Sequence, residues 1–132
     1  MHYTATRLIV LSAAMITLTL LIYMAQPWGD NDAYQSLSEY AWLLGIAVWA
    51  TLPYLIILFL ARKAFEFKAN ILMVAIGTLI ISFGGVALYV DAAFLHRDPQ
   101  GGLVFLAVPC YQWIIIGLLT GIHFLLSKKQ YS

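Results

Sequence analysis

Three side chains near one turn of the sequence are of types that bind metal ions or move protons. Asp91, His96 and Asp98 all fall within the segment DAAFLHRDPQGG. Carboxylate oxygens and imidazole nitrogens are ligands for divalent cations, and the same groups serve as general acids and bases. Their spacing matches no established ligand pattern, however, and Arg97 stands among them as an ion-pair partner. We therefore expect Asp91 to cap its helix or to pair with Arg97, and we predict no metal site and no cofactor.

The composition predicts a membrane protein, in which this turn joins two membrane-spanning segments at the membrane surface. Hydrophobic residues make up 63% of the chain and charged residues 10%, whereas a soluble domain has about 25% charged residues. Four segments are long and apolar enough to cross a hydrocarbon layer of about 30 Å, which takes roughly 20 helical residues. They cover about residues 7–26, 40–61, 70–91 and 103–127. The sequence thus predicts an all-α, integral membrane four-helix bundle with up-down-up-down topology, as a single domain over residues 1–132.

Positive charges give the orientation of this bundle. Six of the seven Lys and Arg residues flank the spans on the side shared by both termini and the loop between the second and third spans. They are Arg7, Arg62, Lys63, Lys68, Lys128 and Lys129. Because cytoplasmic flanks are enriched in Lys and Arg, we predict that both termini are cytoplasmic. The bias also fits a bacterial inner membrane, and the turn around Asp91 becomes an outer-face loop.

Glycines spaced by seven predict a packing face on the third span. Gly77, Gly84 and Asp91 recur every seventh residue. In a regular helix they share one face with Leu88 close by, and that face can approach a neighbouring helix closely at its glycines. The same face carries a carboxylate at its outer end.

Four polar side chains fall near the middle of the four spans. They are Thr17, Thr51, Ser82 and Gln112. Hydroxyl and amide groups need hydrogen-bond partners in hydrocarbon, so this mid-membrane polar layer is expected to join the helices. Intramembrane polar groups also mark solute and ion paths, but no Asp, Glu, Lys or Arg lies deep in a span. We interpret the layer first as structural, with a substrate path as the alternative.

The fourth span carries two faces of different character. Gly117 and Gly121 form a GxxxG pair. Gln112 lies nearly in line with His123, at roughly 150° from the glycines when each residue turns about 100°. One face can pack inside the chain's own bundle, which leaves the other for a second copy of the chain or a different membrane protein. The predicted packing or partner positions are Gly77, Gly84, Gly117 and Gly121.

Two prolines and one cysteine complete the features inside the spans. Pro53 and Pro109 each remove a backbone hydrogen bond, so both helices are expected to bend. Cys110 is the single cysteine, and without an activating base nearby it is expected to be a buried, inert thiol.

Enzyme motifs are absent from the sequence. It contains no CxxC, no HExxH and no glycine-rich phosphate loop after a strand. We predict a small polytopic membrane protein, not an enzyme, that acts by helix–helix binding as an accessory subunit, modulator or immunity-type inhibitor of another membrane protein. It contacts membrane lipid and no nucleic acid.

Two other functions stay open. The first is a homo-oligomeric channel or small-solute transporter in which the polar layer faces a route between protomers. The second is a membrane enzyme acting at the outer face through Asp91, His96 and Asp98.

Overall fold

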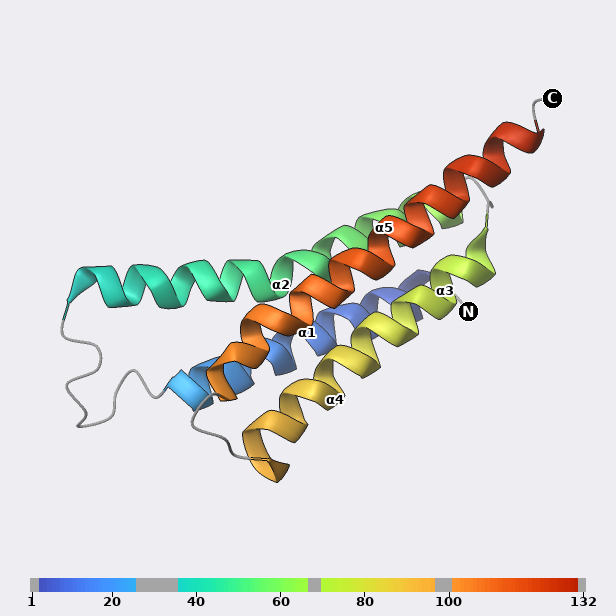
Figure 1. Cartoon of the computed structure of the whole chain (residues 1–132). Coiled ribbons are helices and arrows are strands. Elements are labelled where there is room, and N and C mark those ends of the chain that lie inside the picture. Colours follow the sequence, from blue (N-terminus) through green and yellow to red (C-terminus); the bar gives the residue numbers. More distant parts are fainter. Residues whose placement is uncertain (1–2, 26–35, 67–69, 97–100, 131–132) are drawn as a thin grey trace.

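The computed structural model describes residues 3–25, 36–66, 70–96 and 101–130. These residues form helices (Figure 1). The elements are α1 (Tyr3–Ala25), α2 (Leu37–Glu66), α3 (Ile71–Leu79), the π-helical turn η2 (Ile80–Gly84), α4 (Gly85–Val90), the π-helical turn η3 (Asp91–Leu95), the 3-10 turn η4 (Gly101–Leu103) and α5 (Val104–Gln130).

The four predicted spans are confirmed. Four helices in the described part of the chain are long and apolar enough to cross a membrane. They are Tyr3–Ala25, Leu37–Glu66, Ile71–Leu95 and Val104–Leu126, the third being the continuous run from α3 to η3. α2 extends beyond the predicted 40–61 at both ends. Its N-terminus is capped by a side chain. Ser36 N–H donates to Glu39 Oε2 at 2.8 Å, as in a capping box.

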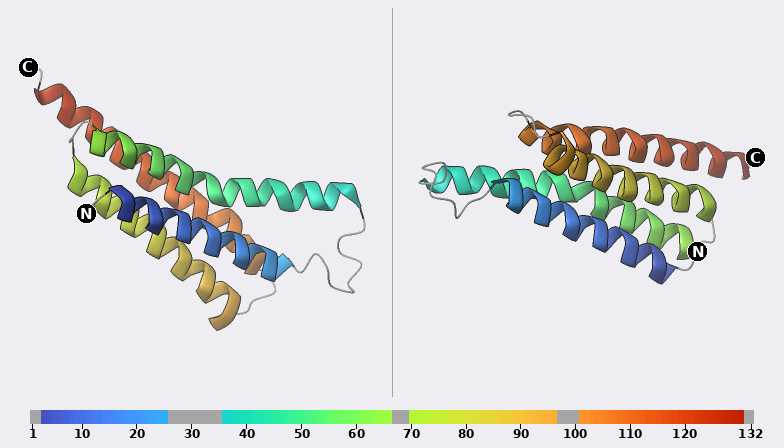
Figure 2. Two further views of the ribbon diagram at one scale, coloured as in Figure 1. Left: turned by 180° about the vertical axis from the view of Figure 1, so that it is seen from behind. Right: turned by 90° about the horizontal axis from the view of Figure 1, so that it is seen from below.

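Successive spans run in opposite directions (Figures 1 and 2). α1 and the α3–α4 run point one way, and α2 and α5 point the other way, so both ends of the chain lie at one end of the bundle. We call this the terminal end, and the opposite end, where α1 stops and α2 begins, the α1–α2 end. α1 packs against α2 and α4, and α5 packs against α2 and α4. The up-down-up-down bundle is therefore observed.

α2 changes direction part-way along its length, so its first half diverges from the other helices (Figures 1 and 2). Pro53 lies inside this helix. Proline lacks a backbone N–H and its ring crowds the preceding turn, which bends a helix. α5 passes through Pro109 as one continuous helix.

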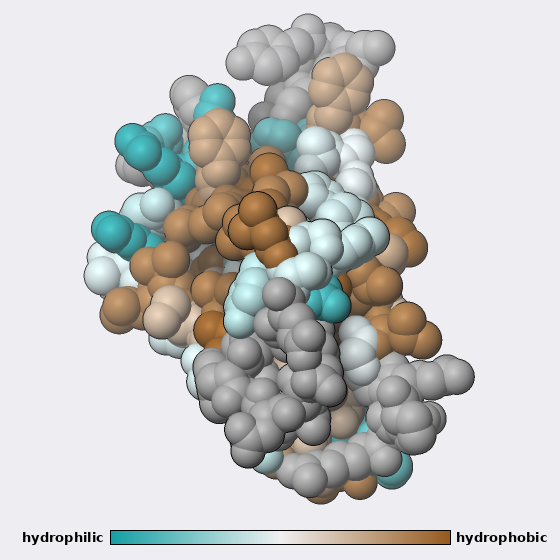
Figure 3. All heavy atoms as spheres, turned by 90° about the vertical axis from the view of Figure 1, so that its left-hand side faces the viewer, coloured by the Kyte–Doolittle hydropathy of each residue, from teal (hydrophilic) through white to brown (hydrophobic). Residues whose placement is uncertain are grey.

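The surface is largely hydrophobic. Large apolar side chains are exposed on every span, for example Leu8, Leu55, Phe83 and Phe124. Seen from the α1–α2 end, brown hydrophobic side chains cover much of both flanks (Figure 3). Soluble proteins rarely expose apolar surface on this scale. The chain is an integral membrane protein whose flanks contact lipid.

The π-helical turns set which side of the third span faces inward. Its buried side chains include Val74, Thr78, Ser82, Tyr89 and Ala93. In a regular α-helix the 19 steps from residue 74 to residue 93 would turn about 100° past five full turns. The wider turns η2 and η3 take up this excess, so all five side chains stay on the inner side.

The predicted face of the third span is therefore corrected in part. Gly77 is buried, but Gly84 and Asp91 are half-buried, and Leu88 is exposed. That prediction assumed a regular α-helix, whereas two π-helical turns change the rotation between these positions. Both glycines still lie against α5: a side chain on Gly77 would collide with Leu119.

Asn70 fixes the entry to α3 at the terminal end. Among the described residues other than glycine, it alone has a positive φ, with φ 52° and ψ 31°. Its Nδ2 donates to His123 Nδ1 on α5 at 2.9 Å. Asparagine tolerates this left-handed conformation better than most residues. One side chain thus shapes the turn and joins it to α5.

Replacing Asn70 should separate these two roles. Asn70→Ala should lower the free energy of unfolding by about 1–2 kcal/mol, because alanine is strained at this φ and makes no bond to His123. Asn70→Gly should lower it less, since glycine adopts the conformation freely. Unfolding in mild detergent, followed by circular dichroism, measures both. Equal losses would show that the backbone conformation is unimportant.

Candidate functional site

Polar side chains from all four spans meet inside the bundle. Thr17 Oγ1 on α1 and Tyr54 Oη on α2 are hydrogen-bonded at 3.1 Å. Gln112 Nε2 on α5 donates to the carbonyl of Ile81 in the π-helical turn η2 at 3.2 Å. We call the whole group the central polar cluster. Its members are Thr17, Tyr54, Ser82, Tyr89, Tyr111 and Gln112.

Two adjacent glycines make room for this cluster. A side chain on Gly85 would collide with Gln112 Nε2, and its Cβ would lie 2.6 Å from Tyr54 Oη. A Cβ on Gly84 would lie 3.0 Å from Tyr111 Oη. The bare backbone where η2 meets α4 therefore lets polar groups from α2 and α5 converge on one point. π-helical turns are frequent at functional sites.

Four threonines elsewhere in the spans form a hydrogen bond within their own helix. Thr19, Thr51, Thr78 and Thr120 each donate to the carbonyl four residues earlier at 2.8 Å. This local bond is the usual arrangement for Ser and Thr in hydrocarbon. The predicted polar layer is thus partly corrected: Thr51 is half-buried and bonded to its own helix.

The other three members of the predicted layer are buried. Thr17, Ser82 and Gln112 have relative exposures of 0%, 2% and 0%. The predicted layer did not include the three tyrosines beside them. Tyrosine normally collects at the membrane–water interface, so its presence at mid-span in three helices was the available signal.

The two predicted faces of α5 lie in different surroundings. Gln112 and Ile116 are buried, and His123 bonds to Asn70, so this face belongs to the bundle itself. Gly117 and Gly121 are exposed, and a Cβ on either would meet nothing within 4 Å.

Exposed residues continue this second face along α5 in alternating steps of three and four. We call it the α5 outer face: Ala107, Cys110, Ile114, Gly117 and Gly121. The expectation of a buried Cys110 is wrong, because its thiol is exposed. Cys110 precedes the inward-facing Gln112 by two residues, so the two side chains point about 160° apart around the helix. Its Sγ donates to the Leu106 carbonyl at 3.2 Å.

The outer-face loop is described only in part. Asp91 Oδ1 and His96 Nδ1 are 2.9 Å apart. The His96 side chain is largely accessible and that of Asp91 about half accessible, so the pair adds little stability. Arg97 and Asp98 lie outside the described residues, and so does the predicted Asp91–Arg97 pair. Among the residues that are described, no group of three His, Cys, Asp or Glu side chains is placed to hold a metal ion.

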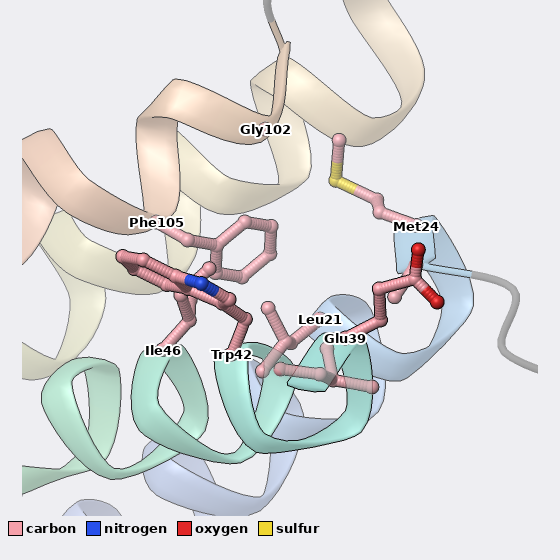
Figure 4. Close-up of a pocket in the computed structure, with 9 residues that line it drawn as sticks. Leu21, Met24, Glu39, Trp42, Ile46, Gly102 and Phe105 are labelled. Carbon is pink, nitrogen blue, oxygen red and sulfur yellow. The ribbon is translucent and has the colours of Figure 1, made fainter. Parts of the chain in front are cut away.

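A cavity of about 510 Å³ opens near the α1–α2 end, between α1, α2 and α5 (Figure 4). Its lining is almost entirely apolar, apart from the Glu39 carboxylate. The residues are Leu21, Met24, Ala25, Glu39, Trp42, Leu43, Ile46, Gly102 and Phe105. A second cavity of about 580 Å³ follows the seam between α2 and α5. Volumes of this size suit hydrophobic ligands or lipid chains, and both lie beside the diverging half of α2.

Comparison of the chain with protein-family models, with curated proteins and with solved structures finds no match. Its function must therefore be inferred from the side chains described above.

Glycine substitutions should distinguish the central polar cluster from the α5 outer face. Gly85→Ala should destabilise the fold by about 1–3 kcal/mol, because the new methyl displaces Gln112 and Tyr54. Gly117→Ala should leave stability unchanged or raise it by up to about 1 kcal/mol, since the site is open and alanine favours helix. Thermal unfolding in detergent compares the two. A harmless Gly85→Ala would contradict the close approach at this position.

Proposed function

We propose that this protein acts without catalysis, by binding a transmembrane helix of a partner membrane protein along the α5 outer face. It would serve there as an accessory subunit, a modulator or an immunity-type inhibitor. The observation that carries the proposal is the exposure of Gly117 and Gly121, whose Cα atoms face open space.

The composition of the α5 outer face supports helix binding. Membrane helices associate through van der Waals packing and hydrogen bonds, and small residues let two backbones approach closely. Glycine in a helix facing lipid lowers helix stability by about 1 kcal/mol relative to alanine and fills no space. Close contact with another helix offsets that cost.

The spacing of the face supports a particular geometry. Ala107, Cys110, Ile114, Gly117 and Gly121 follow the three-four spacing of a coiled-coil seam. Such a seam packs against a partner helix at a crossing angle of about +20°. The partner helix would therefore lie nearly parallel to the axis of α5 and contact it over several turns.

The charge distribution supports a bacterial inner membrane with cytoplasmic termini. Arg62 and Lys63 are exposed near the end of α2, which lies at the terminal end of the bundle. Asp91 and Glu39 lie toward the opposite end. Cytoplasmic flanks carry an excess of Lys and Arg, so the terminal end would face the cytoplasm.

A homo-oligomeric channel or transporter has less support. In that alternative the polar layer lines a route between protomers, but Thr17, Ser82 and Gln112 point into a single bundle. A second copy of the chain nevertheless remains one possible partner for the α5 outer face.

Photo-crosslinking in native membranes tests the proposal. A benzophenone amino acid in place of Ile114 should give a protein adduct, because this position would face the partner helix. The adduct should be lost when Gly117→Leu or Gly121→Leu is added, since leucine keeps the backbones apart. The mass of the adduct distinguishes a second copy from a different protein.

Two controls accompany this experiment. Gly45→Leu is matched in chemistry, because Gly45 is an exposed helical glycine on α2 with nothing within 4 Å, and it should leave the adduct intact. The same photoreactive group at Phe83, exposed on η2, should give lipid adducts. Lipid adducts alone at position 114 would contradict the proposed function.

A further inference from the structure

The central polar cluster contains buried polar atoms that no protein group satisfies. Five buried side-chain atoms of the described residues have no hydrogen-bond partner, and four of them belong to the cluster: Ser82 Oγ, Tyr89 Oη, Tyr111 Oη and Gln112 Oε1, the fifth being Trp113 Nε1. Tyr89 and Gln112 are 0% exposed. A buried hydroxyl or carbonyl without a partner destabilises a fold, and such groups are uncommon in native proteins. Several in one place indicate a ligand.

Two of these side chains lie against the same short piece of backbone, and a third belongs to the same packed group. Tyr111 Oη and Gln112 lie against the adjacent Gly84 and Gly85. Tyr89 is buried in a hydrophobic cluster against which Tyr111 packs. Their bonding capacities are complementary, since each hydroxyl can donate and accept and the Gln112 oxygen can only accept. A small molecule placed among them could bond to several at once.

The chemistry of the cluster limits that molecule to a neutral one. Its members are hydroxyl groups and one amide, with no acidic or basic side chain, and an ion in hydrocarbon needs an opposite charge or a metal-like ligand set. Size is limited too. Neither of the two cavities described above is lined by a member of the cluster.

We propose that the central polar cluster is an enclosed water site. One or a few water molecules would bridge Gln112 Oε1 to the hydroxyls of Tyr89 and Tyr111, and buried water typically makes two to four such bonds. Ser82 follows Ile81, whose carbonyl already binds Gln112, and we assign its buried hydroxyl to the same site. This hydration joins the third span to α5 and extends the Thr17–Tyr54 bond.

One stacked aromatic pair links the site to the cavity of Figure 4. Phe105 lines that cavity and stacks on Tyr89 with ring centroids 4.6 Å apart.

Radiolytic labelling in lipid nanodiscs tests for the water directly, since radicals formed from bound water modify the side chains next to it. Tyr89 should be labelled although it is buried, and so should half-buried Tyr111, whose hydroxyl is buried. Exposed Tyr40 is the positive control. Ile57, buried among apolar side chains, should stay unlabelled. Gln112→Leu should remove most of the label from both tyrosines. Unlabelled Tyr89 and Tyr111 in the unmodified protein would overturn the proposal.

The thermal stability of Tyr89→Phe gives an independent result whose sign is decisive. If water satisfies the hydroxyl, removing it loses a hydrogen bond, and the Tm should fall by about 2–4 °C. If the site is dry, removing an unpaired hydroxyl relieves a penalty, and the Tm should rise. Tyr40→Phe, at an exposed position, should leave the Tm unchanged. A rise for Tyr89→Phe refutes the water site even if Gln112→Leu fails to fold.

Discussion

Hydrocarbon offers no hydrogen bonds, and this constraint governs the whole molecule. Every peptide group in the spans must be paired within the chain, which leaves helices as the form of each segment. The same constraint explains why four threonines bond back to their own helices. Against that background the central polar cluster is the exception. It brings together side chains from all four spans, and some of their polar atoms have no hydrogen-bond partner within the protein.

The sequence predicted the depth of a residue in the membrane better than the direction in which that residue faces around its helix. Hydropathy located the four spans, and counting residues placed Thr17, Ser82 and Gln112 at a similar level. The rotation of a helix about its axis was harder to predict. Thr51 turns toward its own backbone, and Cys110 faces outward, although both lie at the expected depth. Two π-helical turns change the rotation of the third span about its axis, and the regular α-helical period used in the prediction does not include that change.

α5 carries both features on opposite sides. Gln112 faces the interior, and Gly117 and Gly121 face outward, so the two sites share a backbone but no side chain. A contact on the outer side changes the environment of the inner one only through the position of the whole helix. Pro109, one turn before Gln112, leaves the helix one backbone hydrogen bond short near the cluster.

The two π-helical turns also bear on the length of the chain. Each widened turn accommodates about one residue more than a regular α-helical turn does. Deleting a single residue from η2 would allow ordinary α-helical pairing to resume, and the deletion would also remove the rotation of about 100° that one residue adds. Tyr89 and Ala93 would then still face the interior. Within this segment a one-residue deletion would therefore be less damaging than in a regular α-helix, and it would leave the segment helical, apolar and long enough to cross the membrane.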